Sequence, residues 1–233
     1  MAGRRANLRT IEGGKGRAIG LAPEAGAVAR GKAAGVAKGQ AAAARPVTKP
    51  GRSQSKLRSA SLEAAQRTLQ LETSGLRELR QALDNGLGGP FADAVQTVAK
   101  ARGRVIVSGI GKSGHIGQKI AATFASTGTP AFFVHPSEAS HGDLGMITRD
   151  DVILAISWSG ESAELTNIIA FSRRFSVPLI ALTSRKGSAL GSQADVCLEL
   201  PRSKEACPHG LAPTTSTTMQ LAIGDCLAIA LLE

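Results

Sequence analysis

Apolar residues divide the chain into a first part without regular spacing and a second part with clear periodicity. Residues 1–58 are rich in Gly, Ala, Arg and Lys, and their apolar residues follow neither a helical nor a strand pattern. Such a segment cannot bury enough apolar surface to offset the entropy lost on ordering. We therefore expect residues 1–58 to be a disordered basic extension and residues 59–233 to form the folded domain.

Two helices are expected at the start of the folded part. The first runs from residue 61 with leucines near one face, and it ends at Asn85-Gly86. Pro90 opens the second, which continues to Ala101.

Five short apolar runs follow, each of four to seven residues, and helical patterns separate most of them. The runs cover residues 104–109, 131–134, 151–157, 178–183 and 195–200. The longer helical patterns cover residues 113–127, 162–175 and 213–232. Apolar strands that alternate with helices form a parallel sheet covered on both faces. The sequence thus predicts an α/β fold, a three-layer, doubly wound, five-stranded parallel sheet preceded by two N-terminal helices.

The formal net charge of +10 belongs mainly to the first quarter of the chain. Residues 1–59 hold 13 Lys and Arg and two acidic residues, whereas residues 60–233 hold 15 and 16 respectively. The folded part is therefore nearly neutral, and nothing in it favours binding to nucleic acid. The basic extension has two interpretations, an anion-binding or targeting segment and a dispensable extension.

Other global features point to a reducing compartment. The three cysteines are widely spaced and form no C-x-x-C pair, so neither a disulfide framework nor a zinc motif is indicated. No apolar run reaches about 18 residues, and the N-terminus lacks the compact apolar segment of a secretory signal. We expect a cytoplasmic protein that has no membrane partner.

Doubly wound sheets bind ligands beyond the carboxyl ends of their strands, which directs attention to the loops that follow the strands. The first such loop contains Gly109, Gly111, Lys112, Ser113 and Gly114. Glycines allow close approach of the backbone to a ligand, and the N-terminus of the following helix favours an anion. One interpretation is a sugar-phosphate loop in which Ser113 donates its hydroxyl and Lys112 faces the ligand.

The same glycines also fit the G-x-G-x-x-G pattern of dinucleotide-binding oxidoreductases. That pattern expects an acidic residue near the end of the second strand, where this chain has Val134-His135-Pro136. A Walker A loop is excluded, because Ile106 stands where the first glycine of that motif is required.

The second loop contains Ser157, Trp158, Ser159, Glu161 and Ser162. One serine could simply cap the following helix. Three hydroxyl groups exceed that need and match the several donors that a phosphate accepts. Glu161 is either a catalytic carboxylate or a residue that favours the helix N-terminus through the dipole.

A third loop leads into the last helix through Lys204 and Glu205, followed by Thr214, Thr215 and Ser216. Thr is unfavourable inside helices, and capping accounts for only one or two of these hydroxyls. We expect the others to line a polar pocket, with Glu205 as a catalytic candidate or as half of a solvated pair with Lys204.

A fourth loop follows the second strand and contains His141. A single histidine in a loop is either structural or a catalytic or metal-capable residue, and both interpretations stay open here.

Three stretches together carry a family resemblance: GIGKSGHIGQKIAATFASTGTPAFFVHPSEASHGDLGMIT, AISWSGES and KEACPHGLAPTTSTTMQLAIGDCLAIALL. From about Ser59 to its last residue, the chain resembles the SIS (sugar isomerase) domain. More narrowly, it resembles the KpsF/GutQ-type D-arabinose 5-phosphate isomerases. The Ser-x-Ser-Gly-Glu stretch marks the wider superfamily, and the other two stretches mark the narrower group.

The resemblance implies an aldose–ketose isomerase that interconverts D-ribulose 5-phosphate and D-arabinose 5-phosphate, a precursor of the lipopolysaccharide sugar Kdo. It implies a pentose phosphate substrate, no cofactor, and self-association to a dimer or tetramer. On this resemblance Lys112, Glu161 and Glu205 match catalytic positions, with a Glu as base and Lys112 as electrostatic partner. The residues expected to hold the phosphate are Ser113, Ser157, Ser159 and Ser162.

Two features depart from the family pattern. Full-length relatives continue into a segment with a catalytic His in His-Pro-Gly-Gly, and most then carry CBS domains. This sequence contains neither, so we expect a C-terminally truncated member. The alternative function is a catalytically impaired or regulatory sugar-phosphate-binding SIS domain. Trp158 replaces a small polar residue of many relatives, and its side chain is expected to narrow the pocket mouth.

Overall fold

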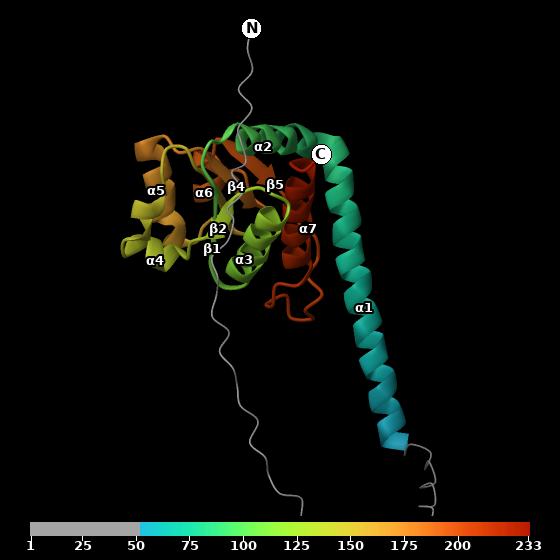
Figure 1. The fold of residues 1–233 in the computed structure, drawn as a ribbon. Helices are drawn as coiled ribbons and strands as arrows, with labels where there is room; N and C mark the ends of the chain where they lie inside the picture. Colours follow the sequence, from blue (N-terminus) through green and yellow to red (C-terminus); the bar gives the residue numbers. More distant parts are fainter. Residues whose placement is uncertain (1–51) are drawn as a thin grey trace, which may run out of the picture. The chain divides into compact units, whose positions relative to one another are not determined.

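Two helices precede the sheet in the computed structural model, which describes residues 52–233 (Figure 1). Helix α1 spans Arg52–Ala82 and α2 spans Gly88–Lys100. The segment Leu83–Leu87 breaks the helical path, and Gly86 adopts a φ of 111° there, a conformation that favours glycine. The break expected at Asn85-Gly86 is confirmed.

Helix α1 begins at Arg52, ahead of residue 59, where the sequence places the domain boundary. Its first turns contain the same Arg, Ser and Lys residues that make the preceding stretch look unstructured, and they have no apolar periodicity of their own. The disorder expected for residues 1–51 lies outside the described residues.

A five-stranded parallel sheet forms the centre of the fold. Its strands are β1 (Val105–Gly109), β2 (Ala131–Phe133), β3 (Val152–Ile156), β4 (Leu179–Thr183) and β5 (Val196–Glu199). All neighbouring pairs are parallel, and the order across the sheet is β2-β1-β3-β4-β5. Each strand falls within one of the predicted apolar runs.

Helices cover both faces of this sheet, so the predicted three layers are confirmed (Figure 1). Successive strand residues point to opposite faces, and Val105 and Val107 belong to one core cluster whereas Ile106 belongs to the other. The first cluster includes residues of α1, α2, α3 (Gly111–Ser126) and α7 (Thr215–Ala230). The second includes residues of α4 (Pro136–Ser140), α5 (Thr166–Phe175) and α6 (Ala189–Gln193).

Helix α7 packs closely against both α3 and α1. A Cβ atom at Gly224 of α7 would collide with the side chain of Ile120 of α3. A Cβ atom at Gly75 of α1 would likewise collide with Cγ2 of Thr215 in the first turn of α7. These glycines allow helix backbones to approach more closely than larger residues would.

The order of the strands places a crevice at the carboxyl ends of β1 and β3. Strand β1 lies between β2 and β3, so the chain leaves β1 toward one edge of the sheet and later returns on the other side. Helix α3 follows β1 and covers one face, whereas the single turn Ala163–Leu165 and α5 follow β3 and cover the other. Such a switch point is where open parallel sheets bind ligands.

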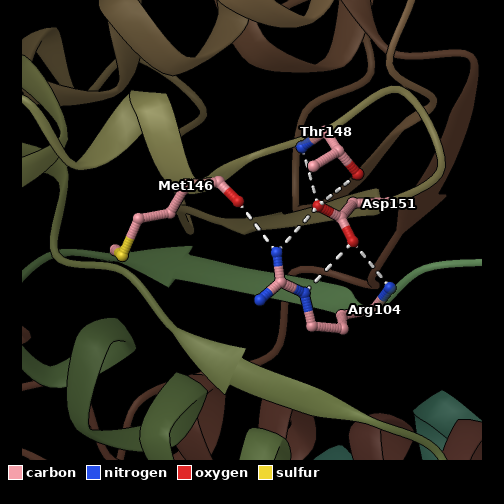
Figure 2. Close-up of polar contacts among 4 residues, drawn as sticks. All are labelled: Arg104, Met146, Thr148 and Asp151. Atoms are coloured by element: carbon pink, nitrogen blue, oxygen red, sulfur yellow. Dashed lines mark hydrogen bonds and ion pairs between the residues drawn. The ribbon is translucent and has the colours of Figure 1, made fainter.

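The opposite, amino end of the same two strands is held by the buried carboxylate of Asp151 (Figure 2). Backbone N–H groups of Arg104 and Thr148 each donate to it at 2.7 Å. The Thr148 hydroxyl donates at 3.0 Å, and Nε and Nη2 of Arg104 donate at 3.3 Å. The Arg104 guanidinium also donates to the Met146 carbonyl at 2.8 Å and lies 4.7 Å above the Phe132 ring.

These contacts keep Asp151 ionised. Burial alone would raise the pKa of Asp151, but the hydrogen bonds from Arg104 and Thr148 outweigh burial and lower the pKa below its ordinary value. The network ties the loop before β3 to the start of β1.

Candidate active site

A cavity of about 300 Å³ occupies the crevice between the carboxyl ends of β1 and β3. Its lining comes from three parts of the chain that are far apart in the sequence: the first turn of α3 with the residue before it, the end of β3 with the loop after it, and Pro213 ahead of α7. The lining residues are Ile110, Lys112, Ser113, Ile156, Ser157, Trp158, Ser159, Ser162 and Pro213. The structure therefore brings Lys112 together with all four of the serines that the family resemblance assigns to phosphate.

The loop after β1 turns directly into α3. Gly111, the first residue of α3, has a backbone φ of 58°, which residues other than glycine rarely adopt. Gly114 lets the helix approach the strand end, because a Cβ there would lie only 2.7 Å from the Gly109 carbonyl oxygen. No side chain caps this helix, so its first N–H groups are available to an anion.

Hydrogen bonds within the loop after β3 fix its three serine hydroxyls. The hydroxyl oxygens of Ser157 and Ser162 lie 2.9 Å apart, and the Gly160 N–H donates to Ser157 Oγ at 3.1 Å. Ser159 Oγ accepts from the Glu161 N–H at 3.2 Å. Ser162 stands at the start of a helical turn, but its hydroxyl makes no capping hydrogen bond. Helix capping therefore does not account for these serines.

Residues of β4 and of the segment that follows it form hydrogen bonds with the same loop. The Trp158 carbonyl accepts hydrogen bonds from the Ser184 N–H at 3.0 Å, the Ser184 hydroxyl at 2.8 Å and the Thr183 hydroxyl at 3.2 Å. The Leu190 N–H donates to the Gly160 carbonyl at 2.9 Å. The loop is thus fixed by the protein before any ligand contacts it, which reduces the entropy lost on binding.

Glu205 lies outside the cavity lining and caps helix α7. Its Oε2 accepts from the Thr214 N–H at 2.7 Å, the Thr214 hydroxyl at 2.8 Å and the Ser216 N–H at 3.4 Å. Burial would raise the pKa of Glu205, but hydrogen bonds from Ser216 and Thr214 outweigh it and the pKa is lowered. A lowered pKa makes this carboxylate a weaker proton acceptor, not the raised one that a general base prefers.

Glu161 occupies a different environment. Its side chain is exposed, and its one hydrogen bond is a long contact of 3.4 Å from the Ala189 N–H to Oε2. The carboxylate belongs to the loop after β3 but does not line the cavity.

Thr215 and Ser216 do not line the cavity either, although the sequence suggested that they would. Both side chains are buried in α7, with exposed fractions of 0% and 1%. Thr215 faces Gly75 of α1, and Ser216 lies beside Glu205. Thr214 donates to Glu205 and also accepts from the Ala206 N–H at 2.9 Å.

Gln220 is a residue of the site that the sequence reasoning missed. It is buried in the second turn of α7, and its Oε1 accepts a hydrogen bond from the Ser113 hydroxyl at 3.2 Å. The one feature of the sequence that sets Gln220 apart is its amide side chain inside the otherwise apolar run 219–223. Its partner lies 107 positions away, which no local pattern reveals.

His141 is exposed at the end of α4 and does not line the cavity. Within residues 52–233, no three His, Cys, Asp or Glu side chains gather in a way that could hold a metal ion. In the same residues, no helix is both long and apolar enough to cross a membrane.

A larger hollow of about 640 Å³ lies near the junction of α1 and α2 and the ends of β4 and β5. Ser184 is the single hydroxyl side chain among its lining residues, and Lys186, Glu199 and Arg202 mix both charges there. It lacks the convergent hydroxyl groups of the smaller cavity, so the smaller cavity is the stronger candidate.

Comparison with known proteins points to one family. The family model of the SIS domain matches residues 97–230. The curated arabinose 5-phosphate isomerases KdsD of Yersinia pestis and Escherichia coli K12 are each 53% identical, over 173 and 171 residues. Each match covers 73% of this chain and 51% of the relative, so the chain spans about half the length of these relatives.

Solved structures show the same relationship. The E. coli CFT073 protein c3406 in complex with arabinose 5-phosphate has a TM-score of 0.70 and 40% identity, covering 75% of this chain and 90% of that one. The Bacteroides fragilis protein named "putative phosphosugar isomerase involved in capsule formation" has a TM-score of 0.67 and 34% identity, covering 74% of this chain and 90% of that one. With the matched residues spanning the sheet, the cavity and α7, the chain belongs to the SIS domain family.

Proposed function

We propose that the chain acts in an aldose–ketose isomerase that interconverts D-ribulose 5-phosphate and D-arabinose 5-phosphate. The observation that supports this most directly is the convergence of four serine side chains, a lysine and a free helix N-terminus on one cavity at the switch point. The similarity to KdsD proteins and to a structure that contains arabinose 5-phosphate narrows the substrate class to pentose phosphates.

The phosphate would be held by the loop after β3, residues 157–162, which we call the serine loop, and by the start of α3. Ser157, Ser159 and Ser162 offer hydroxyl groups from the loop after β3, and the first turn of α3 offers its N–H groups beside Ser113. A phosphate placed here also meets the positive end of the α3 dipole, which stabilises its charge.

Isomerisation requires a base that removes the proton on the carbon next to the carbonyl and returns it to the neighbouring carbon. The resulting enediolate carries negative charge on oxygen, and Lys112 in the cavity lining would stabilise it. Of the two candidate bases, we favour Glu161, because its carboxylate is exposed in the serine loop and weakly held. Glu205 is engaged as the cap of α7.

The proposal is tested by incubating the whole chain with D-ribulose 5-phosphate in deuterated water and following the products by NMR. Formation of D-arabinose 5-phosphate with deuterium at the carbon next to the carbonyl is the expected result. Binding of pentose phosphates without any proton exchange would favour the alternative, a sugar-phosphate-binding domain that does not turn over. Absence of both binding and exchange would exclude the two together.

We also propose that copies of the chain associate through α1. Leu62, Leu69 and Leu76 follow one another at intervals of seven residues, which is the spacing of a coiled-coil seam. The first two side chains are 57% and 65% exposed, although leucine is usually buried. A second copy of the same helix would cover this row and account for its spacing.

A further inference from the structure

Ser113 differs from the other serines of the cavity because its hydroxyl is directed toward the protein interior. Its Oγ donates to Oε1 of Gln220, 3.2 Å away, and thereby joins the first turn of α3 to the second turn of α7. With this donation, the hydroxyl proton is turned away from the cavity. Ser113 then presents only lone pairs to a phosphate, which accepts hydrogen bonds and does not donate them when fully ionised.

The interior around Gln220 has polar groups without partners. Within residues 52–233, Gln220 Nε2 and Thr215 Oγ1 are buried and make no hydrogen bond, whereas the Ser216 hydroxyl lies beside the Glu205 carboxylate. Ser216 precedes Gln220 by one helical turn, so the two side chains share a face of α7. Buried polar groups are nearly always paired, so the unpaired amide nitrogen of Gln220 calls for a rearrangement that gives it a partner.

A half-turn of the Gln220 amide supplies such a rearrangement. The turn exchanges the positions of the amide oxygen and nitrogen while the shape of the side chain is kept. Nε2 then donates to Ser113 Oγ and is no longer unpaired, and Oε1 takes the place of Nε2 on the face that Gln220 shares with Ser216. Since Ser113 Oγ now accepts from Gln220, its own proton is free to point into the cavity.

We propose that Gln220 is a positioning residue that turns the Ser113 hydroxyl toward the phosphate of the substrate. The role rests on the phosphate site proposed above and adds a residue that does not itself touch the ligand. The ordered chain runs from the amide of Gln220 to Ser113 and on to a phosphate oxygen, and each hydrogen bond strengthens the next.

The experiment is a double-mutant cycle on Gln220 and Ser113, with Gln220→Met, Ser113→Ala and the double variant. Met has about the length and volume of Gln, but it cannot donate to Ser113 and its sulfur is only a weak acceptor. Binding of D-arabinose 5-phosphate and of inorganic phosphate to the whole chain is measured by calorimetry. We expect Gln220→Met to lower the affinity for both ligands by a similar factor, about five- to tenfold, because one hydrogen bond to a charged group is partly lost.

The decisive measurement is the effect of Gln220→Met in the Ser113→Ala background. If Gln220 acts through Ser113, the substitution has no further effect on binding there. Equal effects in both backgrounds would show that Gln220 acts only through packing and would overturn the proposal. Wild-type affinity in Gln220→Met would overturn it as well. Failure of the wild-type chain to bind either ligand would instead overturn the phosphate site, and the role of Gln220 with it.

A second variant, Gln220→Glu, gives an independent readout if the Met variant does not fold. An ionised carboxylate only accepts hydrogen bonds, so it holds the Ser113 proton away from the cavity. We expect a larger loss of phosphate affinity than with Met, and partial recovery as the pH falls and the carboxyl becomes protonated. A pH profile parallel to that of the wild type would contradict the proposal.

Discussion

At the scale of single residues, the two glutamates of the site have different roles. Glu205 accepts three hydrogen bonds at the start of α7, whereas Glu161 is exposed and weakly held. Sequence reasoning found both residues because each lies in a characteristic stretch after a strand. It could not separate their roles, since the cap depends on a loop that brings Glu205 back to Thr214, nine positions later.

We predict that Glu161→Gln and Glu205→Gln have different effects. Glu161→Gln should lower the isomerisation rate by about 100-fold or more, as expected for loss of a general base, and leave stability nearly unchanged. Glu205→Gln should destabilise the fold by about 1 kcal/mol through the lost cap. Rates from NMR and midpoints from urea unfolding measure the two effects. A stable, inactive Glu205→Gln variant beside an active Glu161→Gln variant would reverse this assignment.

A second prediction concerns Asp151, whose carboxylate accepts five hydrogen bonds at the amino end of the sheet. Asp151→Asn should lower the free energy of unfolding by about 2 kcal/mol at pH 7, because the amide cannot accept all of these bonds. The neighbouring Asp150→Asn is the matched control, since Asp150 pairs with the exposed Arg102 and should change stability by less than about 0.5 kcal/mol.

The pH dependence of this difference follows from the lowered pKa of Asp151. A carboxylate whose folded pKa lies below its unfolded value stabilises the fold above the unfolded value, near 3.8, and this contribution disappears as the pH falls through the folded pKa. Urea unfolding at pH 7 and at several values below 4 should therefore show the gap between wild type and Asp151→Asn narrowing in acid. A gap independent of pH would mean that shape, not charge, matters at this position.

At the scale of elements, the apolar runs were sufficient to predict the sheet and its layers. Strands buried on both faces are continuous apolar runs, and that property is local. The start of α1 at Arg52 was not predictable in this way, because its first turns carry few apolar residues. The contact between Ser113 and Gln220 was also out of reach, because it depends on how α3 and α7 pack.

The packing of α1 against α7 gives a third prediction, on Gly75. A Cβ at this position collides with Thr215 Cγ2, and the χ1 angle of a β-branched residue in a helix has little freedom to adjust. Gly75→Ala should therefore destabilise the chain by about 1 kcal/mol, despite the higher helix propensity of Ala. In α2, Gly89→Ala meets nothing within 4 Å and should stabilise by about 0.5 kcal/mol. The midpoints of thermal unfolding of the two variants measure these changes. If both substitutions stabilised the chain, the α1–α7 contact would adjust to the added methyl group without cost, contrary to the prediction.

The same contact also bears on the site. Glu78, one turn after Gly75, accepts a hydrogen bond from Ser203, which lies two residues before Glu205. Displacement of α1 should therefore also loosen the loop that carries Glu205.

At the scale of the whole molecule, the proposed association through α1 gives a fourth prediction. The double substitution Leu62→Lys, Leu69→Lys places two charges on the proposed seam and should shift the sedimentation mass toward the monomer. Met146→Lys, an exposed apolar residue in the turn Asp143–Met146, serves as the control and should leave the mass unchanged. A wild-type chain that sediments as a monomer at all concentrations would refute association through α1.

Trp158 lines the proposed phosphate cavity, and the chain contains one Trp and no Tyr. Ultraviolet light near 295 nm therefore excites a single group in the entire polypeptide, and that group stands at the cavity wall. The protein carries its own optical probe, and its emission intensity and wavelength should respond to whatever enters the cavity. Substrates, inhibitors and the variants described above can then be ranked by titration without an attached dye.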